Sequence, residues 1–151
     1  GSFRLYQMND KEIRELYQAR AAVEGQCARI LTDKPDPEII SELRKTIKFE
    51  ESIEGADARA YFDANRAIHR KFVEMAGNRF LLEMFDMIWG KAMAFHLFAA
   101  IENVDLAQSL GDHMTLVDAI EAGDKGAALE LFTDHIHDGF DLQMKGLKGA
   151  V

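Results

Sequence analysis

The sequence contains a single cysteine, Cys27, among its 151 residues. One thiol excludes an intrachain disulfide and any zinc site built from several cysteines. We expect Cys27 to pack as a small apolar side chain. Proline is nearly absent as well, since Pro35 and Pro37 are the only two and stand in one short loop. The residue that most strongly interrupts helices is therefore missing from the rest of the chain.

Basic residues are fewer than acidic ones: the sequence has 18 Lys and Arg and 26 Asp and Glu, which gives a net charge of −8. No Lys/Arg cluster of the kind that follows a phosphate backbone is present, so this stretch is a poor candidate for holding DNA or RNA itself. Long hydrophobic runs are also missing. The apolar stretch 93–101 is bounded by Lys91 and Glu102 and is too short for a membrane span. With no visible signal peptide, we expect a cytoplasmic protein.

The residues that are plentiful favour helix, because Ala, Leu, Glu, Met and Lys dominate and β-branched residues are sparse. No strand-like alternation of apolar and polar residues is found. The apolar spacing and the breaks predict an all-α, antiparallel bundle of about six helices. We expect these helices at 10–31, from the prolines to 53, 57–76, 79–102, from 106 or 112 to 122, and from 124 to 145. The fourth, apolar nearly all round, is expected to be central and buried.

Four polar side chains fall within the apolar stripes of three predicted helices: Asn65, His69, His113 and His135. Asn65 and His69 are four residues apart and share one helix face. Buried polar groups need partners, and one divalent cation would serve all four. Three nitrogens and one oxygen suit zinc, nickel, cobalt or manganese. The alternative is that each histidine is an ordinary core residue bonded to a backbone carbonyl.

Two further polar residues are candidate ligand contacts. Arg20 lies between Leu16 and Val23 on an apolar stripe, where a guanidinium requires an anion. That anion is either Glu24, one turn further on, or the carboxylate of a ligand. His96 lies in the apolar fourth helix, where it either lines a ligand cavity or is a satisfied core histidine. His137, two residues after His135, is expected to face solvent.

Several blocks of sequence, in this order and spacing, resemble one family: the C-terminal effector domain of GntR-type transcriptional regulators of the FadR subfamily, called the FCD domain. The blocks cover nearly the whole chain, and they are ELYQARAAVE (15–24), NRAIHRKF (65–72), AGN (76–78), HMTLVDAIEAGD (113–124) and AALELFTDHI (127–136). The predicted count of six helices resembles the helix count of the VanR-like branch of this family.

The resemblance implies a helical bundle that encloses a ligand cavity, with a divalent metal held by Asn65, His69, His113 and His135. Many members of the family have Asp at the position of Asn65, so the metal affinity or preference here is expected to differ. The family's effector is often a small carboxylate or sugar acid that contacts the metal, and Arg20 matches the family's carboxylate-binding arginine.

The resemblance also concerns the limits of the domain and its partners. We expect residues 1–9 to be a tag remnant, Gly1-Ser2, and a leader, and 10–147 to be the ligand-binding domain. The family's N-terminal winged-helix domain, which binds DNA, is absent from this sequence. We expect a homodimer that acts on DNA only through that missing domain.

Three functions are compatible with these residues. The first is a metal-containing sensor domain without enzyme activity, and this is the function we expect. The second is a metal-dependent hydrolase or lyase with a three-histidine site. Its general base would be Asp63 or Asp112, both predicted to lie off the apolar stripe. The third is a helical interaction module with no metal.

Overall fold

Six helices contain most of the residues that the computed structural model describes, which are 9–90 and 110–149. They are α1 (Asp10–Asp33), α2 (Pro37–Glu51), α3 (Ala58–Met75), α4 (Arg79–Trp89), α7 (His113–Ala122) and α8 (Lys125–Gly149). No β-strand occurs within these two ranges. The predicted all-α fold is confirmed. The first eight residues of the predicted leader, His96 and the second half of the predicted fourth helix lie outside the described residues.

Short polar side chains define where most of the helices begin. In each case an Asn or Asp just before the helix accepts a hydrogen bond from a backbone N–H of its first turn, which would otherwise have no partner. These residues are Asn9, Asp36, Asp57, Asn78 and Asp124. Two of the caps, at Asn78 and Asp124, follow directly after glycines with positive φ, Gly77 (75°) and Gly123 (74°). These left-handed glycines let the chain reverse sharply between helices.

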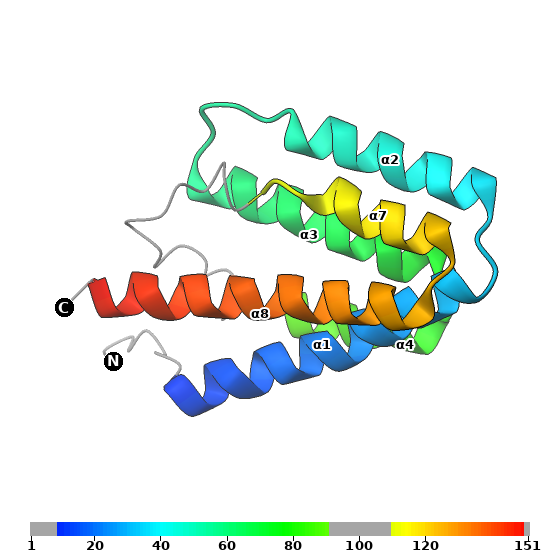
Figure 1. Cartoon of the computed structure of the whole chain (residues 1–151). Helices are drawn as coiled ribbons and strands as arrows, with labels where there is room; N and C mark the ends of the chain where they lie inside the picture. The colour runs from blue at the N-terminus through cyan, green and yellow to red at the C-terminus, as the bar shows by residue number, and fades with distance from the viewer. Residues whose placement is uncertain (1–8, 91–109, 150–151) are drawn as a thin grey trace.

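The helices form an antiparallel bundle in which sequence neighbours run in opposite directions (Figure 1). The long helices α1 and α8 lie side by side and antiparallel, and α4 packs against α1 and α3. On the other side, α2 packs against both α3 and α7, and α7 also contacts α8. This arrangement brings α1, α3, α7 and α8 together, although α1 and α3 lie far from α7 and α8 in the sequence. None of the described helices combines the length and the apolar character that crossing a membrane requires.

The prediction that the fourth helix is buried on all sides is wrong for its described part, α4. Phe85, Ile88 and Trp89 are buried, but the exposed fractions of Phe80, Met84 and Met87 are 59%, 48% and 59%. The physical reason is its position at the side of the bundle, where it packs against α1 and α3 through one face. Trp89, Phe85 and Ile88 form a cluster there with residues of α1 and α3, including Val23, Cys27 and Phe62.

Candidate metal centre

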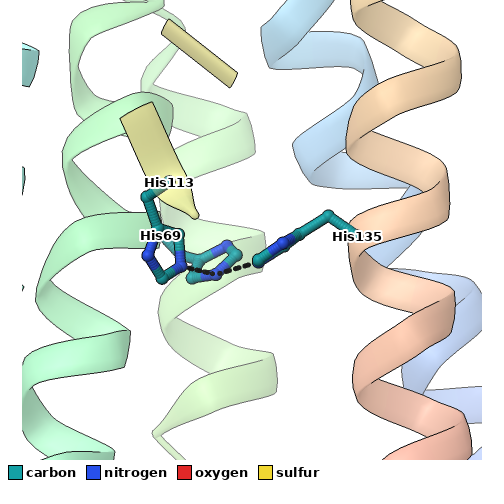
Figure 2. A group of neighbouring side chains, drawn as sticks. All are labelled: His69, His113 and His135. Carbon is teal, nitrogen blue, oxygen red and sulfur yellow. Dashed lines mark hydrogen bonds between the residues drawn. The ribbon is translucent and has the colours of Figure 1, made fainter. Parts of the chain in front are cut away.

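Three histidines from three helices converge in the interior of the bundle. His69 comes from α3, His113 from the first turn of α7 and His135 from α8, and Figure 2 shows their rings directed toward one another. His69 Nε2 lies 3.2 Å from His113 Nε2 and 3.3 Å from His135 Nε2. His69 and His113 are fully buried and His135 is half-buried. The predicted convergence of these three side chains is therefore present in the structure.

Glu24 on α1 holds the outer nitrogen of His69. One carboxylate oxygen of Glu24, Oε1, accepts a hydrogen bond from His69 Nδ1, and the other, Oε2, lies 3.0 Å from Arg20 Nε. Burial by itself would raise the pKa of Glu24, but Arg20 and His69 together lower it to about 2. Glu24 is thus a buried carboxylate that is ionised and shared between a cation and an imidazole.

Glu51, at the end of α2, holds the outer nitrogen of His113 in the same way. Its Oε1 lies 2.9 Å from His113 Nδ1 and also accepts the backbone N–H of His113 at 3.2 Å. The residue before this helix, Asp112, has a positive φ of 70° and gives α7 no side-chain cap. Glu51 therefore supplies the cap that Asp112 does not provide, and it also orients the His113 imidazole. One carboxylate thus fixes both the start of α7 and the position of His113.

These contacts determine where the ring protons are. A carboxylate can only accept, so His69 Nδ1 and His113 Nδ1 carry the hydrogens. In the neutral rings, both Nε2 atoms then present lone pairs to each other across 3.2 Å. Burial lowers the pKa of His69 to about 4, although Glu24 opposes this. Burial, together with His69 and His113, lowers the pKa of His135 to about 2. Protonation of His69 is therefore a poor way to relieve the facing lone pairs.

The chemistry of this donor set fits a divalent cation. Zinc–nitrogen bonds of about 2.0–2.1 Å at tetrahedral angles place neighbouring nitrogens about 3.3 Å apart. The two Nε2 separations in the structure, 3.2 and 3.3 Å, are close to that value, and the ligand atoms of all three histidines lie within 4.8 Å of one another. Metal-bound histidines also normally donate their other N–H to a carboxylate or carbonyl, as His69 and His113 do here.

The remaining predicted ligand residues have mixed outcomes. Asn65 is half-buried one turn before His69 on α3, and its part in metal binding stays a prediction. Arg20 is buried and pairs with Glu24, which was one of the two anions expected for it, so its contact with a ligand also stays a prediction. His137 is exposed and lies 3.5 Å from Asp141, as expected for a residue facing solvent.

The carboxylates of the site were not identified from the sequence. Asp63 and Asp112, the candidate general bases, are exposed, and Asp63 pairs with Arg59. Glu24 and Glu51 reach the histidines instead. The sequence did carry a signal for Glu24, which lies on the buried face of α1 with Val23 and Cys27 and must have a partner there. No local pattern indicates Glu51, because its partner is 62 residues away.

The aromatic surroundings of the centre come mainly from Trp89. The Trp89 ring stacks on His69 at a centroid separation of 5.5 Å, and the Arg20 guanidinium carbon lies 4.2 Å from its centroid. A groove of about 310 Å³ is found elsewhere, between α1 and α8, with Tyr17, Ile136 and Phe140 in its walls. None of the three histidines lines that groove, so the groove is not the ligand cavity that was predicted around the metal.

Comparisons with known proteins agree with this fold. Among curated proteins, the "Probable D-xylose utilization operon transcriptional repressor" of Paenarthrobacter nicotinovorans is 29% identical over 134 residues, which cover 88% of this chain and 58% of that protein. The chain thus spans little more than half the length of this relative.

Two solved structures share the fold. The metal-free FCD domain of TM0439 superposes with a TM-score of 0.72 at 24% identity, covering 95% of this chain and 99% of that one. Escherichia coli McbR/YncC superposes with a TM-score of 0.79 at 14% identity, covering 95% and 69%. The FCD domain family matches residues 15–138. This match confirms the resemblance to the FCD domain that was found in the sequence, and the chain belongs to the FCD domain family.

Proposed function

We propose that this chain is the effector-sensing domain of a transcriptional regulator and that it binds a divalent metal through His69, His113 and His135, with Asn65 as a fourth ligand. The observation that carries this proposal is the 3.2 Å separation of His69 Nε2 and His113 Nε2 in a buried site, with the outer nitrogen of each ring held by a carboxylate. A cation between them would remove their repulsion and use the hydrogen bonds that Glu24 and Glu51 already make to the outer nitrogens.

The effector in this proposal is a small carboxylate or sugar acid that contacts the metal. Three histidines and an amide leave coordination positions free on a metal that takes five or six ligands, whereas zinc would have to expand beyond its usual four. The name of the curated relative, a repressor of a D-xylose operon, supports a sugar-derived ligand. Arg20 is a candidate contact for the acid, although the Arg20–Glu24 pair would then have to open. Effector binding would favour one packing of the helices over another.

DNA would be bound by a separate domain, and the effector would control that binding. The acidic charge of this chain, −8, does not suit a phosphate backbone, and the resemblance to GntR-type regulators supports a winged helix as the partner domain. We also propose a homodimer, because two-fold symmetric regulators match palindromic operators.

An enzyme is the weaker candidate. Within the part of the chain that the structure describes, the two carboxylates that reach the histidines both accept imidazole N–H groups, so neither is free to act as a general base.

Metal analysis and ligand screening together test the proposal. Purified chain, dialysed after loading with zinc, should retain about one ion per protein, and His135→Ala should retain none. Small carboxylates should then raise the melting temperature of the loaded protein without being consumed. Turnover of the ligand would indicate an enzyme instead, and a chain that retains no metal would overturn the metal proposal.

A further inference from the structure

His135 is held differently from the other two histidines of the centre. The outer nitrogens of His69 and His113 are each held by a carboxylate, from Glu24 and Glu51. Among the residues that the structure describes, no carboxylate bonds to His135, whose Nε2 lies 3.3 Å from His69 Nε2. Its ring otherwise contacts only the rings of His69 and His113 within these ranges. The position of His135 must therefore come from the packing of α8, the helix that carries it.

Helices α1 and α8 share the most extensive contact between any two of the described helices, and each contributes a glycine to it. Gly25 lies on the buried face of α1, where a Cβ atom would be 3.0 Å from Leu129 Cδ1 of α8. Gly139 of α8 lies beside Tyr17 of α1, with 3.7 Å between its Cβ position and Tyr17 Cε1. Glycine weakens the interior of a helix relative to alanine. The close approach of Leu129 supplies a packing reason for Gly25.

These two contacts lie on either side of His135. Along α8, Leu129 comes six residues before His135 and Gly139 four residues after it. Their partners come in the opposite order along α1, because the two helices are antiparallel (Figure 1). The two contacts are about 15 Å apart along the helix axis. The stretch of α8 that carries His135 is thus held against α1 at both of its ends.

The same part of α1 supports His69. Glu24, the neighbour of Gly25, accepts the Nδ1 hydrogen of His69. The support of His69 and the seat of Leu129 therefore share one turn of α1, and the position of α8 along α1 sets how far His135 lies from His69. A displacement by one residue along a helix is about 1.5 Å, whereas metal–ligand distances must agree to within about 0.2 Å. A small change in this packing would remove His135 from the centre.

We propose that Gly25 and Gly139 are positioning residues of the metal centre. By receiving side chains of the opposite helix, they fix α8 on α1 so that His135 reaches an ion held by the other two histidines. This inference rests on the proposed function and adds what sets the third ligand in place. By linkage, an ion that requires this packing also stabilises it. The contact between α1 and α8 then depends on whether metal is bound.

A size exchange tests this positioning. Gly25→Val fills the space that Leu129 occupies and displaces α8, so the affinity for zinc, measured by competition with a coloured chelator, should fall about tenfold or more. Gly25→Val combined with Leu129→Ala gives the space back and should recover most of that loss. The matched control is Gly126→Ala in the exposed first turn of α8, where a Cβ meets only Asp124 Oδ1, at 3.6 Å. It should bind zinc within about twofold of the parent.

A double-mutant cycle separates an effect on His135 from a general effect on folding. The weak zinc affinity that His135→Ala retains, measured by calorimetry at high zinc concentration, should change less than about twofold when Gly25→Val is added, because the ligand through which Gly25 acts is already gone. Urea unfolding of the metal-free variants establishes that each is folded. If Gly25→Val does not fold, Gly25→Ala takes its place and should show a smaller loss in the same direction, since its Cβ would still crowd Leu129.

A folded Gly25→Val protein that binds zinc as tightly as the parent would overturn the inference, and so would a size exchange that recovers none of the loss. A loss that is equally large with and without His135 would overturn it too, because Gly25 would then act on the bundle and not through this ligand. All three results leave the metal centre intact, since the parent still binds zinc. A parent that retains no zinc contradicts the proposed function, and this inference with it.

Discussion

The carboxylate of Glu24 joins two helices by accepting the Nδ1 hydrogen of His69. Glu24 comes from α1 and His69 from α3, and both side chains are 1% exposed. The second oxygen of Glu24 pairs with Arg20 one turn earlier on α1. The orientation of a candidate metal ligand and the neutralisation of a buried cation therefore depend on the same group. Any change that draws Arg20 away from Glu24 would alter the hydrogen bond that holds His69.

The first prediction concerns the stability that this shared carboxylate provides. Glu24→Gln keeps an acceptor for His69 but leaves the buried Arg20 without a counter-charge. Breaking a buried ion pair from one side costs about 3–5 kcal/mol, and we expect a loss of that size in the free energy of unfolding by urea. The exposed variant Glu15→Gln should stay within about 0.5 kcal/mol of the parent.

A double variant makes this prediction specific. When Arg20→Met is combined with Glu24→Gln, no uncompensated charge remains, so the loss of stability should be clearly smaller than the sum of the two single effects. Strictly additive effects would show that the two residues do not depend on each other.

The second prediction concerns Glu51 and the affinity for metal. Glu51→Gln keeps an oxygen that can cap α7 but removes the negative charge behind His113. Outer partners of metal-bound histidines contribute about 10–100-fold to affinity, and we expect a decrease in that range for zinc. Competition with a coloured chelator measures it. Glu54→Gln, on the exposed loop after α2, is the control. Unchanged zinc affinity in Glu51→Gln would show that this hydrogen bond does not influence the metal.

The third prediction uses the fluorescence of Trp89. Its ring stacks on His69 with 5.5 Å between centroids, so an ion on the histidines would lie close to the fluorophore. Copper(II) or cobalt(II), which have unpaired electrons, should quench the emission at about one equivalent, whereas zinc should quench it far less. The same titration of His135→Ala should show no quenching at that ratio. Equal quenching of the variant would place the ion somewhere else.

The fourth prediction concerns the only thiol. Cys27 is fully buried, and burial, together with the negative charge of Glu24, raises its pKa to about 12. A thiolate is the reactive form, so Cys27 should not react with a disulfide reagent in the folded protein near neutral pH. The reaction should proceed fully in urea. Rapid labelling of the native protein would mean that α1 opens far more readily than its packing indicates.

Metal should protect this thiol further. Ligands that bind only the folded state add about 2.7 kcal/mol of stability at a concentration 100 times the dissociation constant. Labelling of Cys27 at moderate urea should therefore slow when zinc is added and recover when a chelator removes it. The same addition should leave the labelling rate of His135→Ala unchanged.

The fold could largely be predicted from the sequence because its signals are local. Asn9, Asp36 and Asp57 are caps that can be recognised next to an apolar repeat, and Gly77 and Gly123 indicate where helices end. The exposed face of α4 could not be predicted in this way. Phe80, Met84 and Met87 give the same apolar pattern whether a neighbouring helix covers them or not, and only the packing of α4 against α1 and α3 decides which face is covered.

The candidate site was predictable in part for a similar reason. His69, His113 and His135 each interrupt an apolar stripe, so each helix indicates by itself that a polar group points inward. The roles of Glu24 and Glu51 depend on contacts that span 45 and 62 residues. No helical periodicity carries information over that distance, and the α7 start at His113 further depends on the left-handed conformation of Asp112.

Anomalous X-ray diffraction from crystals of the protein loaded with zinc would test the central claim most directly. We predict one strong peak, about 2.0–2.2 Å from the Nε2 atoms of His69, His113 and His135, with Glu24 and Glu51 still bonded to the outer nitrogens. A map without a peak between these three side chains, or with the ion bound only at the surface, would contradict the account.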